Sequence, residues 1–143
     1  MDKDFRVGQA NELIKGGRIY DLHNCFDFDY LTILEDGDLR LGFKPNASHG
    51  GGYAPVLLCA KGVDHFAVSP NFGPTTVHHL EEIGYKSRGD EDDNWLLSQS
   101  QATVADDLFF RFNDGHYVRF RSQSASLIET LATPDSPSQA PRG

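Results

Sequence analysis

The sequence predicts a mainly β fold: an antiparallel sheet or sandwich built from hairpins, with one or two short helices. Two segments carry this prediction, residues 26–43 and residues 108–121. In each segment apolar and polar residues alternate and the run crosses an Asp-Gly turn, which is a strong hairpin signal. Ten Phe, five Tyr and one Trp among 143 residues supply large apolar areas, so we expect an aromatic core.

The elements before the first hairpin are short. Residues 11–15 are predicted to form a helix that ends at Gly16 and Gly17, because glycine commonly follows the C-terminus of a helix. Residues 18–22 are predicted to form a short strand that leads into the first hairpin.

The first hairpin is predicted to close through a two-residue type I′ turn at Asp36 and Gly37. A shift of one residue in the register would exchange the two faces of the strand, so the turn decides which side chains are buried. The expected core side extends to Phe26 and Phe28, and it pairs Leu34 with Leu39, Thr32 with Leu41, and Tyr30 with Phe43. Arg40 and Lys44 are then expected in solvent, while Leu31 and Ile33 lie on an outer face that is half covered.

The middle of the chain alternates between loops and short strands. We expect a loop over residues 46–55 with three glycines at its centre, a strand buried on both faces over 56–60, a turn at Lys61-Gly62, a strand over 63–68 and a loop over 69–74. Residues 75–86 suit either a helical turn or a strand. An acidic loop follows at residues 90–95.

The second hairpin is predicted to turn through three residues, Asn113-Asp114-Gly115, as a type I turn with Gly115 in the left-handed region. The core side then pairs Phe112 with His116, Phe110 with Val118, and Leu108 with Phe120. The outer side places Asp107 opposite Arg121 and Arg111 opposite Tyr117, with Arg119 in solvent. Residues 126–131 either continue this hairpin or pack as a short separate segment.

The organisation is that of a single β-rich domain over residues 1–133, followed by a Pro- and Ser-rich tail over 134–143 that we expect to be disordered. No apolar run approaches the ~20 residues that span a bilayer, and the charged N-terminus lacks a signal peptide's apolar stretch. We therefore expect a cytoplasmic protein with no membrane partner. In a reducing compartment Cys25 and Cys59 are expected to be buried free thiols.

The charge balance bears on partners. A net charge of −8 argues against nucleic acid, because binding phosphates requires a basic footprint. Arg111, Arg119 and Arg121 cluster in one hairpin, where a solvated sheet face is the simpler interpretation. The acidic balance instead favours a protein partner with a basic surface. The partner-binding residues that we predict are those of the acidic loop: Asp90, Glu91, Asp92, Asp93, Asn94 and Trp95.

Metal-binding patterns are weak. Asp90, Asp92 and Asn94 have the spacing that opens a calcium loop, but Trp95 stands where that loop needs glycine. Adjacent histidines such as His78 and His79 point in different directions, which favours a surface pair over a metal site with Glu82. His23, Cys25 and Cys59 would make three zinc ligands only if the fold brought Cys59 close. We therefore predict no metal and no cofactor.

Catalytic patterns are weaker still. Asp27 and Asp29 share a strand face, and the wet side of an antiparallel sheet explains them more simply than a pair of catalytic carboxylates. The glycines at 50–52 lack the Lys-Ser/Thr ending of a phosphate-binding loop, and no nucleophile motif is present. We predict that the chain is not an enzyme and has no catalytic residues.

The order of several segments resembles a family of small bacterial proteins. An acidic first hairpin strand, the strand at 56–60, Gly-Val-Asp-His-Phe-Ala-Val at 62–68, Glu-Ile-Gly-Tyr at 82–85, Asp-Asn-Trp-Leu at 93–96 and a late aromatic hairpin follow one another. This order is similar to the immunity protein 50 group of polymorphic toxin systems, over residues 25–120. The helix and His-Asp pair that open such proteins are replaced here by Asp-Leu-His-Asn at 21–24. The resemblance implies that the chain binds and blocks a toxin.

Three functions remain open at the sequence level. The first is an acidic, non-catalytic protein that binds and neutralises a bacterial toxin with a basic surface. The second is a β-barrel or sandwich whose Phe residues surround a small apolar ligand. The third, a metal-dependent cupin-like enzyme, lacks histidines at alternate strand positions. The position of Trp95 distinguishes two interpretations of the acidic loop. If the loop is only solvated, Trp95 is expected to fold back into the core, which is the simpler expectation. If the loop is an interface, Trp95 is expected to anchor the partner.

Overall fold

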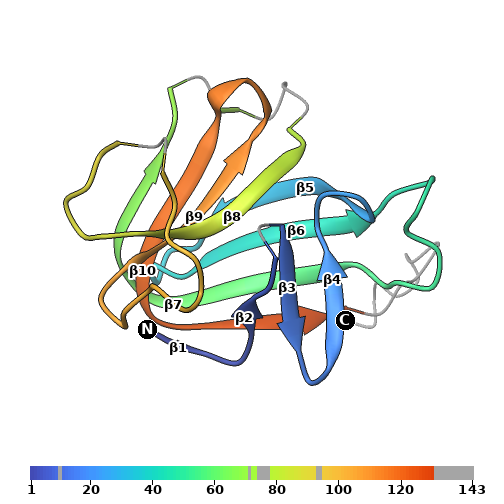
Figure 1. Ribbon diagram of the computed structural model, residues 1–143, viewed down its shortest axis with the longest axis horizontal. Coiled ribbons are helices and arrows are strands. Elements are labelled where there is room, and N and C mark those ends of the chain that lie inside the picture. The colour runs from blue at the N-terminus through green and yellow to red at the C-terminus, as the bar shows by residue number, and fades with distance from the viewer. Residues whose placement is uncertain (10, 71, 74–77, 93–94, 131–143) are drawn as a thin grey trace.

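The structure, a computed structural model, describes residues 1–9, 11–70, 72–73, 78–92 and 95–130. It confirms a mainly β fold with antiparallel sheets (Figure 1). The expected disordered tail at 134–143 lies outside the described residues, as do residues 75–77 of the segment whose structure the sequence left open. No helix in the described ranges is long and apolar enough to cross a membrane.

The larger sheet has seven strands and curls into a half-barrel (Figure 1). Its order is β5-β6-β7-β10-β9-β8, and the short β1 pairs with β10 in parallel. Its strands are β1 (Asp2–Lys3), β5 (Phe26–Ile33), β6 (Leu39–Pro45), β7 (Val56–Val68), β8 (Leu80–Lys86), β9 (Asp107–Phe112) and β10 (Tyr117–Glu129). A second, three-stranded sheet contains β2 (Arg6–Val7), β3 (Glu12–Lys15) and β4 (Arg18–Asp21).

One hydrophobic core joins the two sheets. Leu13 of β3 is fully buried in it, together with strand residues of the larger sheet. The curl of the larger sheet brings aromatic rings of distant strands together. The ring centroids of Phe28 (β5) and Phe112 (β9) are 5.1 Å apart, and those of Phe43 (β6) and Phe110 (β9) are 6.3 Å apart. These four rings pack against one another across the curled sheet.

The N-terminal segment corrects one prediction and confirms another. Residues 11–15 are expected as a helix, but Glu12–Lys15 form strand β3 instead, and residues 18–21 form the expected strand β4. Gly16 and Gly17 have φ values of 60° and 81° and make the turn between the two strands. Burying Leu13 against the larger sheet decides for a strand, because a single turn of helix has little stability of its own. In the described residues the only helical element is the 3₁₀ turn η1 (Asn113–Gly115).

Strands β7 and β10 are neighbours in the middle of the larger sheet, and they pair along most of their length. The predicted turn at Lys61-Gly62 is wrong, because β7 runs through it from Val56 to Val68. Gly62 adopts a φ of 69° within the strand, and the register shifts between Arg121 and Ser122 of β10, which leaves Asp64 as the extra residue of a bulge. Residues 56–60 are buried on one face and half buried on the other.

In the first hairpin, the predicted burial pattern is confirmed on strand β6 but not along the whole of β5. Leu39, Leu41 and Phe43 are buried, and Arg40 and Lys44 are exposed, as expected. The predicted register is wrong by one residue: Ile33 pairs with Leu39 and Leu31 with Leu41, while Tyr30 faces outward beside Gly42. The turn has three residues rather than two, since the Leu34 amide donates to Asp38 and the Gly37 amide donates to Leu34. A bulge at Asp29 then returns Phe28 to the core, opposite Phe43.

The second hairpin has the predicted register. Phe110 pairs with Val118 and Leu108 with Phe120, and all four are fully buried. The three-residue loop is also present, with Gly115 at a φ of 75°. Asp114 differs from the predicted type I turn, because its φ of 60° is also left-handed. The strand continues to Glu129, which settles residues 126–129 as part of β10.

The outer face of the second hairpin is not solvated. Arg119, expected at the surface, is 6% exposed, and Asp107 beside it is fully buried. Arg111 and Arg121 are also largely covered, with exposed side-chain fractions of 21% and 13%. The predicted solvated arginine face is therefore wrong, and its charges require buried partners.

Candidate functional site

The acidic loop follows β8 after residues 87–89, and its described residues lie at the surface. Asp90, Glu91 and Asp92 are exposed, whereas the predicted residues Asp93 and Asn94 lie outside the described part of the chain. Trp95 is 73% exposed, so the expectation that it folds back into the core is wrong. The residues after it supply the packing instead: Leu97 exchanges two backbone hydrogen bonds with Tyr85, and Leu96 lies against Gly84.

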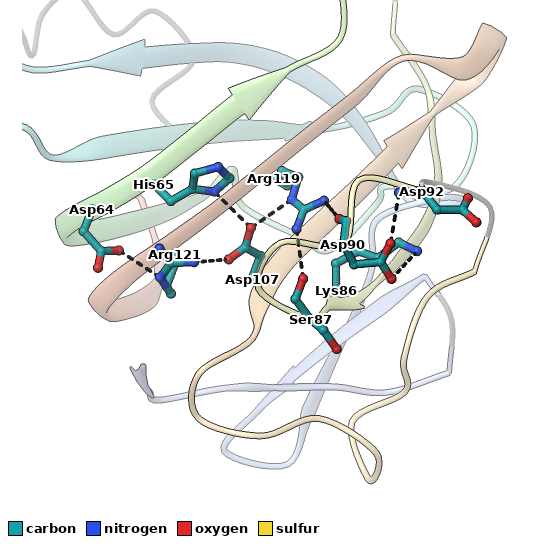
Figure 2. Close-up of polar contacts among 9 residues, drawn as sticks. All are labelled: Asp64, His65, Lys86, Ser87, Asp90, Asp92, Asp107, Arg119 and Arg121. Atoms are coloured by element: carbon teal, nitrogen blue, oxygen red, sulfur yellow. Dashed lines mark hydrogen bonds and ion pairs between the residues drawn. The ribbon is translucent and has the colours of Figure 1, made fainter.

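A buried carboxylate organises the face beneath this loop. Asp107 accepts hydrogen bonds from Arg119 Nε at 2.8 Å, Arg121 Nη1 at 2.9 Å and His65 Nδ1 at 3.0 Å. Figure 2 shows these three side chains converging on Asp107 from strands β7 and β10. Because both oxygens accept charged donors, the carboxylate is satisfied although it is fully buried.

Arg119 connects this carboxylate to the backbone of the acidic loop. Its Nη1 donates to the Asp90 carbonyl at 2.5 Å, and its Nη2 donates to the Ser87 carbonyl at 3.4 Å (Figure 2). A single buried guanidinium therefore fixes two points of the loop to β9 and β10. The segment from Ser87 to Asp90 is thus held from below by Arg119, in addition to the hydrogen bond that the Asp90 amide donates to the Ser87 carbonyl.

Lys86 makes a second connection, at the start of the loop. Its side chain is 1% exposed, and its Nζ lies 3.4 Å from Asp90 Oδ2. The Asp92 amide donates to the other oxygen, Asp90 Oδ1, at 3.0 Å. The Asp92 amide is the largest cause that lowers the pKa of the Asp90 carboxyl, and Lys86 lowers it further. Asp90 is therefore ionised at neutral pH and shapes the loop, in addition to contributing charge.

Arg121 closes the opposite end of the network. Its Nη1 binds Asp107, and its Nε lies 3.2 Å from Asp64 Oδ1, an ion pair without hydrogen-bond geometry. Asp64 is the extra residue of the β7 bulge, which places its carboxylate beside Arg121. The arginine stripe of the sequence is thus the internal scaffold of the site, and it presents little cationic surface.

A shallow cleft of about 290 Å³ lies between the scaffold and the loop. Its lining includes the His65 imidazole, the stacked rings of Phe109 and Tyr117, and the acids Asp90 and Glu91. An imidazole held by a carboxylate has the geometry of a general base. The described lining contains no Ser, Cys or Lys side chain that could act as its nucleophile. The Asp90 and Glu91 carboxylates of this lining can accept hydrogen bonds from a cationic or hydrogen-bonding surface.

The other predicted sites are dispersed or buried. His78, expected at the surface, is 5% exposed and packs against Phe28, Phe72 and Phe112, whereas His79 is exposed. His23 Nδ1 contacts the Leu80 carbonyl at 2.6 Å. Cys25 and Cys59 are free thiols, as predicted, but they are half buried rather than buried. Glu82 pairs with Arg111. Among the described residues no three His, Cys, Asp or Glu side chains are grouped to hold a metal ion.

Sequence reasoning missed Asp107, Arg119, Lys86 and His65 as members of one site. One signal was present: Leu108, Phe109 and Phe110 are three consecutive apolar residues, which is typical of a strand covered on both faces.

Comparisons of this chain with known protein families, with curated proteins and with solved structures find no match.

Proposed function

We propose that this chain is a non-catalytic binding protein of the immunity type, which neutralises a toxin by docking the loop at residues 90–95 on a basic surface. The observation that carries the proposal is the exposure of Trp95 beside a loop whose backbone is fixed by the buried Arg119. Exposed tryptophan is uncommon on solvated surfaces and is enriched among the residues that dominate binding energy.

Charge supports the same partner class. The chain carries a net charge of −8, and Asp90, Glu91 and Asp92 stand together at the surface beside Trp95. A concentrated negative patch speeds association with a positive one and selects against acidic partners. The resemblance to the immunity protein 50 group points to the same role, with a basic nuclease-like toxin domain as the target class.

The fixed backbone matters for affinity. Ordering a loop on binding costs free energy that is lost from the complex. Here Arg119 and Lys86 already hold Ser87 and Asp90 in the free protein. The start of the loop, at Asp90, therefore meets its partner already held in place.

Co-expression with the product of the adjacent gene tests the proposal. Growth arrest caused by that product alone, and relieved by this chain, supports toxin neutralisation; arrest that is not relieved contradicts it. In the purified complex, Trp95→Ala is expected to weaken binding by about 2 kcal/mol, or roughly 30-fold in Kd. Val104→Ala is the matched control, because Val104 is an apolar side chain that is 81% exposed outside the loop.

Charge reversal tests the steering. Asp92→Lys combined with Asp93→Lys is expected to slow association at least tenfold at low salt and to leave the fold intact. Glu35→Lys combined with Asp29→Lys makes the same change in net charge at exposed positions on the first hairpin and its turn. Equal association rates for the two double variants, measured by stopped flow at two salt concentrations, would remove the loop from the interface.

A further inference from the structure

A cleft larger than the one beside the acidic loop lies along β5, an end strand of the sheet, and shares no lining residue with that first cleft. It has a volume of about 520 Å³, which is in the range of small-molecule sites. β5 is an end strand of the half-barrel, and the cleft wall beside it comes from residues just before β8, the strand at the other end. The cleft therefore lies where the curled sheet stays open, a common place for ligands in β folds.

The wall of the cleft is aromatic and held by packing. The Phe72 ring stacks on the His78 imidazole with centroids 4.1 Å apart, and Phe28 meets Phe72 edge to face at 5.8 Å. Phe28 and His78 are further supported by Phe112 of the core. These contacts place aromatic surface at the cleft before any ligand arrives.

His78 adds an acceptor to this wall. Its Nε2 lies 3.2 Å from the Gly73 carbonyl, so that nitrogen carries the proton and donates. Nδ1 then holds a lone pair, and it is buried without a hydrogen-bond partner. Burial lowers the pKa of His78, so the imidazole is neutral and attracts no anion. The lone pair of Nδ1 lies in the plane of the imidazole, so a donor must approach the nitrogen in that plane.

Two carboxylates at the cleft have no internal use. Asp27 and Asp29 both line it, and neither makes a hydrogen bond or ion pair with another residue in the described ranges. Lys44, opposite Asp27 on β6, is the one Lys or Arg in the described lining. Asp27, Asp29 and Lys44 together give the described lining a formal charge of −1, and the aromatic ring faces beside them also attract cations. This chemistry differs from the purely apolar ligand that the number of Phe residues suggested.

We propose that this cleft binds a small organic cation, an ammonium or amidinium group on an aromatic or short alkyl body. The body lies against Phe28 and Phe72, the charge faces Asp27 and Asp29, and an N–H of the ligand donates to His78 Nδ1. This site is separate from the acidic loop, and its occupancy does not depend on the toxin-binding role.

Titration of the full chain with three isosteric probes tests the proposal. Benzamidine is the cation, benzamide its neutral counterpart and benzoate the anion. By calorimetry and amide chemical shifts, benzamidine is expected to bind about tenfold more tightly than benzamide, with benzoate weakest. The shifts should map to residues 27–31, 72–73 and 78–79. Benzoate binding as tightly as benzamidine, shifts elsewhere, or no binding by benzamidine would overturn it.

Variants sharpen the assignment. Asp27→Asn with Asp29→Asn is expected to weaken benzamidine binding about tenfold. Glu35→Gln with Asp2→Asn removes two exposed acids outside this cleft and is expected to leave binding unchanged. Equal losses in the two double variants would show a general charge effect and overturn the site. A folded His78→Phe variant that binds benzamidine as well as the natural chain would also overturn it, because the acceptor would then be unused.

Discussion

The two hairpins have the same sequence pattern and opposite outer faces. Each alternates apolar and polar residues across an Asp-Gly turn, and each buries its aromatic side. On β6 of the first hairpin, Arg40 is exposed, as the alternation predicts. On β10 of the second hairpin, Arg119 stands at the corresponding kind of position and is 6% exposed. Alternation thus identifies the apolar face but leaves open what covers the polar one.

The two hairpins differ in whether another segment of the chain covers their polar outer face. The segment from Ser87 to Asp90 passes over the second hairpin, and its carbonyls accept from Arg119 while Asp107 neutralises that charge. The first hairpin ends the sheet at β5, and nothing in the described chain pairs with that edge. A polar strand face can therefore be internal when its charges are complementary and its cover supplies backbone acceptors.

The largest loss of stability is expected on the buried core face, which both hairpins have in common. Phe110 is fully buried in the core face, and Phe110→Ala should destabilise the fold by about 3–5 kcal/mol through lost burial and a residual cavity. Urea denaturation measures the free energy of unfolding. A loss below about 1 kcal/mol would mean that this face is not the core.

The next effect distinguishes the two outer faces. Arg119→Ala should cost about 3 kcal/mol, because it leaves Asp107 with one donor fewer and the Asp90 carbonyl without its guanidinium donor. Arg40→Ala is the matched variant on the exposed face and should cost under about 0.5 kcal/mol. Equal losses in paired urea melts would contradict the assignment of a buried network to the second hairpin alone.

A smaller effect concerns a tyrosine beside the second hairpin. Burial raises the pKa of Tyr85 to about 12, against 10 for an exposed phenol. The folded state keeps this proton longer than the unfolded one, so the contribution is complete below pH 10 and is lost as pH rises toward 12. The rise of the pKa from 10 to about 12 corresponds to a loss of about 2–3 kcal/mol.

Comparison of variants isolates this titration. Tyr85→Phe lacks the Gln99 hydrogen bond and starts less stable at pH 8, but its stability should fall less between pH 10 and 12. Tyr30→Phe on the first hairpin is the counterpart, since Tyr30 is 41% exposed and its pKa is raised without reaching the same shift. In parallel alkaline melts of all three proteins, Tyr85→Phe should differ more from the natural chain than Tyr30→Phe does.

The smallest effect tests the turn that differs from prediction. Gly37 has a φ of 88° at the end of the three-residue loop, and an added side chain there meets no neighbour within 4 Å. Gly37→Ala should therefore cost about 1 kcal/mol from backbone strain alone. Gly51→Ala, in open space without positive φ, is the control. No difference between the two in thermal melts would argue against the observed turn.

Part of the discrepancy could have been found in the sequence. Phe26 and Phe28 occupy even positions of β5, whereas Leu31 and Ile33 occupy odd ones, and such a change of phase requires a bulge between them. Gly42 opposite Tyr30 is a second hint, because a ring can lie over a glycine of the neighbouring strand. Neither hint identifies the residue that bulges, since that depends on how Phe28 meets Phe112 across the sheet.

The candidate site was only half accessible to sequence reasoning. The acidic loop is visible as a run of Asp and Glu next to the only Trp. Its support is not visible, because Arg119 lies 29 residues from Asp90 in the chain and Asp107 lies 42 residues from His65. Contacts at such separations are set by the pairing of β9 and β10 and by the loop that covers them.

The sequence by itself determined the β class, the position of both turns and the core face of the second hairpin, because these follow from the two-residue period of a strand and from local turn chemistry. Only the tertiary structure decided that Arg119 is buried, that Trp95 is exposed and that His78 joins an aromatic cluster. Burial of a polar or aromatic side chain depends on which distant segment covers it. That choice is made by packing across the whole sheet, and no local pattern contains it.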